Sequence, residues 1–367
     1  MKKINLIFFL PEFIRGGAAN SILSLCKNLK KNKFNIHIIS LEKFEYNQEF
    51  KKIAIVYKIP VKKTLFAQNY IQKIIHKVCS NNLNTIFISN LFHANVLTAI
   101  FQKKRKNLKF VFTERTTLSE LFIYFSIWDF IKKTIIKILI KFFYNKSDLI
   151  IANSKKVAND LERYSNCKST YIYPGTFNKF YKKKHINYYK KKQNIIWIGR
   201  IAKEKGVESL IDVFKKIDKK KYNLKILGEG PLKNRIISKI KKSNLKGNIK
   251  VLGFKKNTAI YLKKSDLLIN TSFFEGFPNV VIEALSNSVP VICSQSGGGI
   301  NEILLNGKLG DIYNQNKSND LYLKILNFLK NPKILNDKAS KAYKNLKRFD
   351  KKYSAKKYEK IFYSIKF

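Results

Sequence analysis

Two glutamates in the segment 271–302 have the type and spacing to bind a polar ligand. Glu275 falls in a Gly/Pro loop, and Glu283 lies eight positions later on the helix expected after Pro278. A carboxylate on that helix can accept two hydrogen bonds from the vicinal diol of a ribose. Glycines at 297–299 let backbone N–H groups approach a phosphate or a sugar closely. For either glutamate taken alone, a solvated side chain on an ordinary connection is the alternative.

A second pair of candidate residues is cationic. An expected strand ends at Gly199, and Arg200 and Lys205 follow in a loop that feeds a helix beginning near Gly206. Two cations beside a helix N-terminus suit a diphosphate, because arginine grips two oxygens and lysine acts as a point charge. They would stabilise the charge that develops on a departing nucleoside diphosphate. The alternative, two surface cations, is weaker for Arg200 because only seven of the 73 basic residues are arginine.

The segments that must position these residues alternate between strand and helix patterns. Short apolar runs predict buried parallel strands, and glycine-containing or polar turns lead from them into helices. In an open α/β sheet, ligands bind at the carboxyl ends of strands, so both glutamates and the glycine turn are expected to face one cleft. A strand is expected to open each of the segments 4–10, 34–40, 85–90, 109–115, 147–163, 169–178, 194–214, 223–236, 248–254 and 289–293, and the segment 265–272 leads into the loop of Glu275.

Length and charge narrow the classes of protein. A chain of 367 residues suits two domains of ordinary size. The net charge of +49 first suggests nucleic acid as a partner, but the lysines are dispersed and form no stripe with stacking aromatics, so we expect none. A positive surface also favours anionic lipids and a diphosphate-bearing substrate. The four cysteines are widely spaced, which is typical of reduced core residues in a cytosolic protein, and no apolar run is long and uncharged enough to span a bilayer.

The two signatures together resemble those of a known enzyme family. The sequence EGFPNVVIE at 275–283 is similar to the E-x7-E motif of retaining glycosyltransferases of family 4, which have the GT-B fold. The sequence GRIAKEK at 199–205 resembles the family's diphosphate-binding arginine and lysine. The resemblance covers essentially the whole chain and is stronger over 194–302 than before it.

The resemblance implies an α/β fold of the GT-B class, with two doubly wound Rossmann-like domains that face a central cleft. The expected domains are an acceptor-side domain over 1–180 and a nucleotide-sugar-binding domain over 193–345. The polar segment 182–193 is expected to link them. The helix expected over 350–367 would return to the N-terminal domain.

The resemblance also implies the residues of the donor site. Glu275 would lie near the donor sugar and phosphate, Glu283 would hold the ribose, and two glycine turns would border the nucleobase. The cation pair takes the place of a metal, so neither a metal ion nor a cofactor is expected beside the nucleotide sugar, for which UDP is favoured. The expected donor-binding residues are Gly16, Gly17, Arg200, Lys205, Gly228, Glu229, Phe254, Glu275, Gly276, Phe277, Pro278, Asn279, Val280 and Glu283.

Gly16 and Gly17 lie between the first expected strand and the helix that follows it. Strand, glycine turn and helix form an anion-binding N-terminus, although a plain tight turn fits the residues equally well. The resemblance favours the first reading, with the turn facing the donor phosphate and the acceptor. Many relatives have a charged pair next, where this chain has Ala19 and Asn20, so the local contacts differ.

Three residues are expected to take part in catalysis: His93, Glu114 and Glu275. His93 follows the carboxyl end of a strand, where a lone histidine is more often structural. The resemblance, however, implies a cleft histidine near the donor sugar. Glu114 would orient the acceptor hydroxyl or, alternatively, form an ion pair with Arg115 that closes a loop.

The segment 118–146 is dense in aromatic and aliphatic residues and is interrupted by lysines. Within it, Ile131, Ile135 and Ile138 alternate with lysines in the pattern of a basic amphipathic helix. Such a helix can lie in a membrane interface, or it can pack on a core with its lysines outside. Both interpretations stay open on the sequence.

These expectations combine into one function. The chain is expected to be a retaining glycosyltransferase that moves a hexose or N-acetylhexosamine from a nucleotide sugar to a lipid-linked or growing glycan of capsule, O-antigen or lipooligosaccharide. It would be cytoplasmic and peripherally associated with the inner face of the cytoplasmic membrane. The alternatives are a nucleotide-sugar epimerase of the same fold, a glycogen-type synthase and, from another class, a basic nucleic-acid-binding protein.

Overall fold

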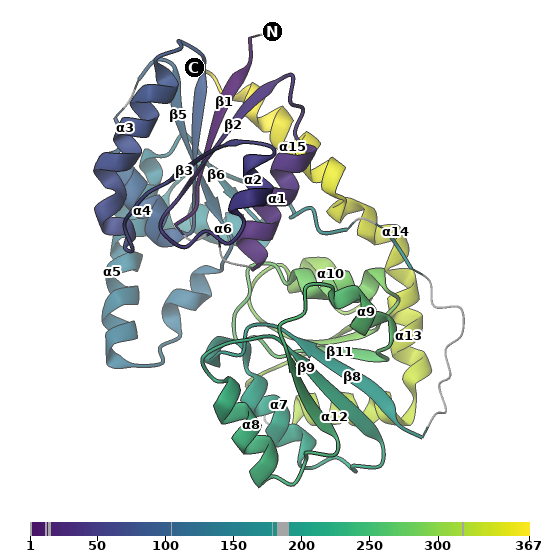
Figure 1. Ribbon diagram of the computed structural model, residues 1–367. Helices are drawn as coiled ribbons and strands as arrows, with labels where there is room; N and C mark the ends of the chain where they lie inside the picture. Colours follow the sequence, from purple (N-terminus) through teal and green to yellow (C-terminus); the bar gives the residue numbers. More distant parts are fainter. Residues whose placement is uncertain are drawn as a thin grey trace. The chain divides into compact units, whose positions relative to one another are not determined.

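The computed structural model describes residues 2–11, 13, 16–103, 105–177, 179–181, 191–317 and 319–367. The chain divides into two compact units, each built on its own parallel β-sheet (Figure 1). Unit 1 comprises Met1–Thr176 with Phe349–Phe367, and unit 2 comprises Phe177–Arg348. Residues 182–190 of the expected linker lie outside the described part of the chain.

The sheet of unit 1 contains seven strands in the order β3-β2-β1-β4-β5-β6-β7, and all of their pairings are parallel. Every residue of β1 and β4 is buried, as continuous apolar runs predict for strands covered on both faces. The short edge strand β3 is half-exposed and was not among the expected strands. The strands are β1 Ile4–Phe9, β2 Phe34–Ser40, β3 Ile55–Lys58, β4 Thr85–Asn90, β5 Leu108–Glu114, β6 Leu149–Ala152 and β7 Ser169–Tyr171.

Successive side chains of these strands point to opposite faces of the sheet, so unit 1 has two cores. One core joins Phe9, Phe87 and Phe112 to four helices: α3 Gln68–Cys79, α4 Phe92–Phe101, α5 Ile127–Phe143 and α6 Lys155–Ser165. The other core joins Phe8 and Val111 to three helices: α1 Gly17–Asn28, α2 Asn47–Lys51 and α15 Lys351–Ser364.

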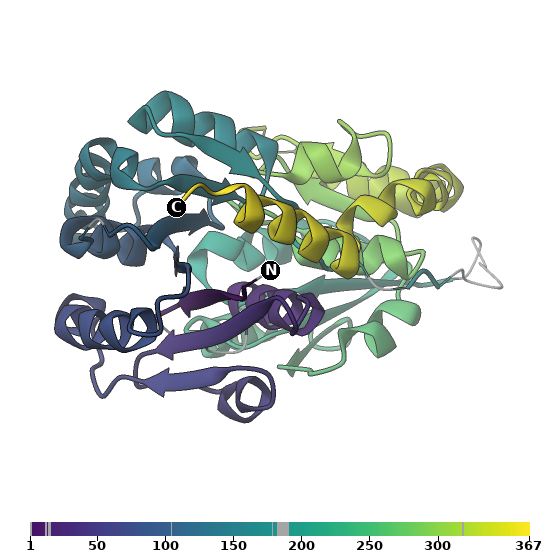
Figure 2. The ribbon, with the colours of Figure 1, turned by 90° about the horizontal axis from the view of Figure 1, so that it is seen from above.

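The last helix of the chain packs on unit 1. Helix α15 lies beside α1, as the two views of the ribbon show (Figures 1 and 2). The ring of Phe362 contacts Phe34 of β2 edge-on, with 6.1 Å between the ring centroids. The chain thus leaves unit 1 after Thr176 and re-enters it at Phe349, where the backbone N–H of Thr176 donates to the carbonyl of Phe349 at 3.0 Å.

The sheet of unit 2 contains six parallel strands in the order β10-β9-β8-β11-β12-β13. Helices α7, α8 and α12 cover one face, where Trp197 and Phe214 lie in the core, and α10 packs against β11 and β12. The strands are β8 Gln193–Ile198, β9 Tyr222–Leu227, β10 Ile249–Gly253, β11 Leu267–Asn270, β12 Val291–Ser294 and β13 Asp311–Tyr313. The helices are α7 Val207–Phe214, α8 Lys233–Lys242, α9 Thr258–Lys263, α10 Asn279–Ser286, α11 Ile300–Leu304, α12 Asp320–Lys330, α13 Pro332–Lys341 and α14 Tyr343–Leu346.

Both sheets are doubly wound, which confirms the expected α/β class. In unit 1 the chain moves from β1 outward to β2 and β3, and then returns to place β4 on the other side of β1. In unit 2 it moves from β8 to β9 and β10, and then places β11 on the other side of β8. Ligands of such sheets bind outside the carboxyl ends of the strands at this reversal. In unit 2, a ligand site is therefore expected at the loops after β8 and β11.

Candidate functional site

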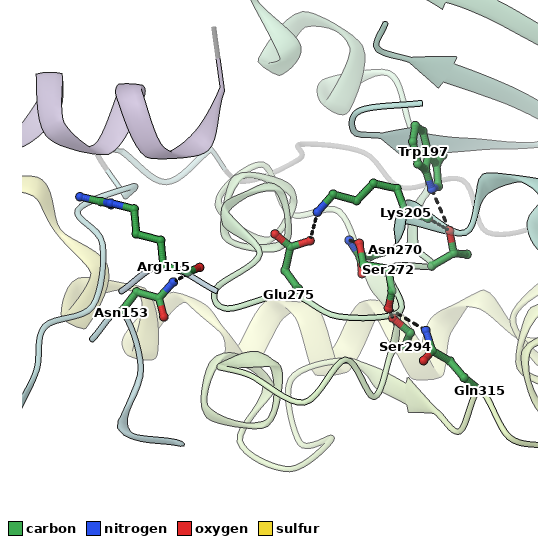
Figure 3. A network of polar contacts seen from close by, with 10 residues as sticks. Arg115, Asn153, Trp197, Lys205, Asn270, Ser272, Glu275, Ser294 and Gln315 are labelled. Atoms are coloured by element: carbon green, nitrogen blue, oxygen red, sulfur yellow. Dashed lines mark hydrogen bonds and ion pairs between the residues drawn. The ribbon is translucent and has the colours of Figure 1, made fainter. Parts of the chain in front are cut away.

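The loops after β8 and β11 bring an ion pair to the carboxyl edge of the second sheet. Lys205 ends the short 3₁₀ turn Lys203–Lys205, and Glu275 lies in the loop between β11 and α10. The ammonium of Lys205 donates to a carboxylate oxygen of Glu275, and Figure 3 shows the two side chains pointing toward one another. Each side chain is about one-fifth exposed (22% and 21%), so the pair is open to a ligand.

Arg200 adds a second cation to this edge. Its backbone carbonyl accepts from the N–H of Ala202 at 2.9 Å, and its side chain is exposed. The guanidinium has no hydrogen-bond or ion-pair partner among the residues that the structure describes. A fixed backbone with an open guanidinium suits the bidentate binding of phosphate oxygens.

Close contacts between backbones explain the glycines of the next loop. Gly228 has a φ of +144°, and a Cβ atom built there would lie 1.8 Å from the carbonyl oxygen of Gly199. A Cβ atom on Gly230 would lie 2.3 Å from the carbonyl oxygen of Ile201. The glycines therefore let the β9 loop pack directly on the loop that carries Arg200, a packing role beside the donor contact expected of Gly228.

The loop of Glu275 is held by the glycine turn that follows β12. The N–H of Glu275 donates to the carbonyl of Ser296 at 3.1 Å, and the N–H of Gly299 donates to the carbonyl of Gly276 at 2.8 Å. Phe277 and Pro278 are buried, and Asn279 begins α10, on which Val280 is half-buried. Pro278 occupies the position before the helix and not its first turn, a small correction to the expected boundary.

Glu283 lies on α10 and is half-buried. One of its carboxylate oxygens accepts a hydrogen bond from the hydroxyl of Thr258, the first residue of α9, at 3.0 Å. Thr258 was not among the expected site residues, and nothing local to it pointed to Glu283, 25 positions away. The contact orients the carboxylate that is expected to hold a ribose.

Glu229 and Phe254 complete the edge at the ends of β9 and β10. Glu229 is exposed and pairs with Lys233 at 2.8 Å, and the hydrogen bond from that lysine holds the pKa of Glu229 below its ordinary value. Phe254 follows Gly253, whose φ is +71°, and its side chain is 48% exposed. An exposed aromatic ring at this edge can stack on a planar ligand group.

In unit 1, the expected residues Gly16, Gly17 and His93 lie beyond the carboxyl ends of β1 and β4. The two glycines open α1, are exposed, and do not have positive φ values. His93 is exposed in the first turn of α4. The preceding Leu91 has a φ of +76°, a region that a bulky residue rarely adopts, and such strain is commonest at functional sites.

Glu114 differs from its expected placement. Its side chain is 1% exposed, and one carboxylate oxygen accepts from the amide of Asn95 at 2.5 Å and from the hydroxyl of Tyr144. Burial raises the pKa of Glu114 to about 8, against hydrogen bonds from Tyr144 and Asn95 that lower it. In this conformation the carboxyl is buried and bonded to Asn95 and Tyr144, and is not presented to solvent as an acceptor-binding group would be.

The alternative ion pair between Glu114 and Arg115 is also absent from the described residues. Arg115 Nε donates to Oδ1 of Asn90 at 3.4 Å instead. The carbonyl of Arg115 accepts from the side-chain amide of Asn153 at 2.7 Å (Figure 3). Asn90, on the neighbouring strand β4, thus takes the contact that was considered for Glu114.

The described residues contain no cluster of three or more His, Cys, Asp and Glu side chains that could hold a metal ion. Within the same residues, no helix has both the length and the apolar character that crossing a bilayer requires.

Comparison with known proteins adds the family. The model of Glycosyltransferase Family 4 matches residues 15–176, and the model of Glycosyl transferases group 1 matches residues 178–347. Phe177 alone separates the two matches, and the other uncovered residues lie at the two ends of the chain.

Individual relatives agree with the family models. The chain is 35% identical to an uncharacterized glycosyltransferase of Methanocaldococcus jannaschii, over 57% of this chain and 53% of that protein. It is 28% identical to N-acetylgalactosamine-N,N'-diacetylbacillosaminyl-diphospho-undecaprenol 4-alpha-N-acetylgalactosaminyltransferase of Campylobacter jejuni, over 96% of each protein.

The fold has solved counterparts. The structure of Anabaena HepE in complex with UDP and glucose matches with a TM-score of 0.77 at 18% identity, over 98% of this chain and 99% of that one. At this identity the match supports the fold, which is of the GT-B class. The two family models, which divide the chain between them, show that this protein belongs to the family 4 glycosyltransferases.

Proposed function

We propose that this glycosyltransferase moves a hexose or N-acetylhexosamine from a nucleotide sugar, with UDP favoured, to a lipid-linked or growing glycan, and that the anomeric configuration is retained. The observation that carries the proposal is the placement of Lys205 and Glu275 in contact at the carboxyl edge of the second sheet. Arg200 stands open on the loop between them and β8, and Glu283 lies on the helix that follows Glu275.

Each of these residues has a distinct task in the proposed reaction. The bond between the anomeric carbon and the diphosphate oxygen breaks, and an acceptor hydroxyl bonds to the same face of that carbon while its proton passes to the leaving phosphate. Arg200 and Lys205 would neutralise the charge that gathers on the diphosphate. Glu275 would contact the donor sugar, and Glu283 would bind the ribose hydroxyls. We assign no covalent nucleophile.

Two relatives support the choice of substrates. The name of the Campylobacter jejuni relative describes an acceptor on diphospho-undecaprenol, and HepE was solved with UDP and glucose. A polyprenyl-diphosphate acceptor and a UDP-sugar are therefore the first substrates to test. The polysaccharide would be a capsule, O-antigen or lipooligosaccharide, made at the inner face of the cytoplasmic membrane.

The surface of α5 supports the proposed place at a membrane. Trp128 is 77% exposed, and the face that α5 shares with the segment before it carries further exposed rings and isoleucines. We call this face the α5 surface; it comprises Phe122, Tyr124, Ile127, Trp128, Phe130, Ile131, Ile135, Ile138 and Phe142. The buried side of the same helix packs on the core of unit 1 through Ile140, which leaves the α5 surface for the proposed membrane contact.

Charge makes anionic lipid the matching partner of the α5 surface. Asp129 is the one acidic residue of α5, and it is paired with Lys133 at 2.9 Å. Lys133 also donates to the carbonyl of Ile123 at 2.7 Å, which holds the aromatic segment against the helix. Exposed lysines between the apolar residues would meet lipid head groups while the rings enter the interface.

A thermal-shift panel with UDP, GDP, ADP and their common sugars tests the donor site. A ligand that binds only the folded protein raises the melting temperature. We expect a rise with one nucleotide that Glu283→Ala abolishes. No rise with any of them would contradict the proposed donor site.

A transfer assay then tests the reaction. We expect sugar to pass from the donor to a polyprenyl-diphosphate glycan with retained configuration, which NMR of the product measures. Conversion of the donor without an acceptor would indicate an epimerase, and inverted product would refute retention. Flotation with anionic liposomes tests the proposed membrane binding. We expect the wild-type protein to float with the vesicles and Trp128→Ser to be lost from the vesicle fraction. A wild-type protein that stays in solution at low salt would contradict the proposed membrane binding.

A further inference from the structure

The loop that carries Lys205 is tied to the neighbouring strand by a chain of two hydrogen bonds. The indole N–H of Trp197, on β8, donates to the hydroxyl of Thr271 at 3.0 Å (Figure 3). The same hydroxyl donates to the backbone carbonyl of Lys205 at 2.7 Å. An indole N–H can only donate and a carbonyl can only accept, so the direction of both bonds is determined and the single hydroxyl proton of Thr271 is committed to Lys205.

Backbone contacts at the same place leave the loop little freedom. The N–H of Phe273 donates to the carbonyl of Glu204 at 2.8 Å. Gly206 has a φ of +64°, and a Cβ atom there would lie 2.2 Å from the carbonyl oxygen of Thr271. The segment after β11 thus contacts three successive residues of the Lys205 loop, and among these contacts Thr271 holds the backbone of Lys205 through its side chain.

Trp197 and Thr271 are themselves in no position to touch a ligand. Each residue is 2% exposed, and the ring of Trp197 lies in the core between the sheet and its helices. Their polar atoms have each other and the carbonyl of Lys205 as partners, which is the arrangement that buried polar groups require. Any effect they have on a ligand must therefore pass through Lys205.

Lys205 needs such support because its side chain is long and flexible. Four rotatable bonds separate its ammonium from the backbone, so an error in the position of Cα is carried to the cation. Glu275 holds the ammonium end in this structure, and Thr271 holds the backbone end. A diphosphate that draws the ammonium from Glu275 would leave the backbone contact in place.

We propose that Thr271 and Trp197 are positioning residues that hold Lys205 for the diphosphate of the donor. The inference rests on the proposed function, in which Lys205 binds that diphosphate. It adds a requirement for two buried residues that never contact the donor. It also separates phosphate binding from nucleoside binding, because the hydrogen-bond chain ends at Lys205 and not at the ribose or the base.

Titration calorimetry with UDP and with uridine tests the inference on the whole 367-residue chain. Thr271→Val keeps the shape of the side chain but removes the hydroxyl, and we expect it to weaken UDP binding by about five- to tenfold, the size of one lost hydrogen bond. Uridine lacks phosphates, so its affinity should not change. Thr271→Ser restores a hydroxyl and should bind UDP nearly as the wild type does.

A double-mutant cycle with Lys205→Ala shows whether Thr271 acts through that lysine. In the Lys205→Ala background, Thr271→Val should weaken UDP binding no further. Trp197→Phe keeps an aromatic six-membered ring but removes the N–H together with the five-membered ring of the indole. It is the second variant if Thr271→Val does not fold, and it should reproduce part of the Thr271→Val effect.

Three outcomes would overturn the inference. One is unchanged UDP affinity in Thr271→Val, and the second is an equal loss for UDP and uridine, which would mean general damage to the site. The third is a full additional loss in the Lys205→Ala background. A wild-type protein that binds none of UDP, GDP and ADP would instead overturn the proposed function, and this inference with it.

Discussion

The buried carboxyl of Glu114 makes a sharp prediction about pH and stability. One oxygen accepts two hydrogen bonds, from Asn95 and Tyr144, whereas Oε2 has no partner among the described residues. The side-chain oxygen of Asn95 also has no hydrogen-bond partner among the described residues. A proton on Oε2 reduces the cost of this arrangement, because a neutral acid is far cheaper to bury than a carboxylate with an unsatisfied oxygen.

The sign and size of the change in stability with pH follow from the pKa values of Glu114 in the unfolded and the folded protein. Burial raises its pKa from the ordinary 4.5 to about 8. Below pH 4.5 the folded and unfolded states both hold the proton. As the pH rises toward 8 the unfolded state releases it and the folded state does not, so stability falls. At about 1.4 kcal/mol for each pH unit between the two values, the loss is on the order of 5 kcal/mol above pH 8.

Glu114→Gln removes this loss while keeping the shape of the side chain. The amide stays neutral at every pH, so we expect the variant to be more stable than the wild type at pH 9 and the difference to shrink toward pH 5. Urea unfolding at pH 5, 7 and 9 measures this difference in the free energy of unfolding. A chain of two compact units can unfold in two transitions, so the measurement uses the transition that responds to the substitution. Glu42→Gln, at an exposed residue of the same unit, is the matched control.

Equal pH dependence in Glu114→Gln and the wild type would refute the reasoning, since it would mean that the carboxyl is ionised and satisfied in the folded state. The same variant also examines the catalytic role expected from the sequence. If Glu114 only stabilises the fold, Glu114→Gln should keep transfer activity within a few-fold of the wild type. If its carboxyl contacts the acceptor, the variant should lose far more activity than that.

Three further predictions concern other parts of the molecule. Arg200→Ala should lower the kcat/KM for the donor by about 10- to 100-fold with an unchanged melting temperature, since charged hydrogen bonds to phosphate are lost; near wild-type kinetics would remove Arg200 from the site. Gly228→Ala should cost at least about 2 kcal/mol in urea unfolding because the new Cβ meets a backbone oxygen, whereas Gly247→Ala, which meets nothing within 4 Å, should not. Trp128→Ser should weaken binding to anionic vesicles without loss of soluble donor affinity, and unchanged flotation would contradict the proposed role of the α5 surface.

Much of the candidate site could be read from the sequence because its parts are local. Glu275 and Glu283 lie eight positions apart across one loop and one helix start, and Arg200 and Lys205 lie in one turn. Buried parallel strands appear as continuous apolar runs, so the carboxyl ends where ligands bind could be located as well. The edge strand β3 was not predicted, although Ile55, Val56 and Tyr57 are apolar, and its residues are only half-buried.

The α5 segment shows where a local pattern stops being decisive. Its spacing of isoleucines and lysines predicted an amphipathic helix, which the structure contains. Which side of that helix meets the core is not a property of the helix alone. Ile135 and Ile138 turn out exposed while Lys133 is buried, because Lys133 has local partners in Asp129 and the carbonyl of Ile123.

The sequence by itself determined the family signatures, most of the strands and the residues that could bind a nucleotide sugar. Only the tertiary structure decided which of them meet. Lys205 and Glu275 are 70 positions apart and form a pair because β8 and β11 are neighbours in the sheet, and the same adjacency brings Thr271 to the Lys205 loop. Glu114 has the sequence context of an active-site acid, yet the helices that cover β5 enclose it. Strand order and helix packing depend on the whole chain at once, and the spacing of residues within one segment does not record them.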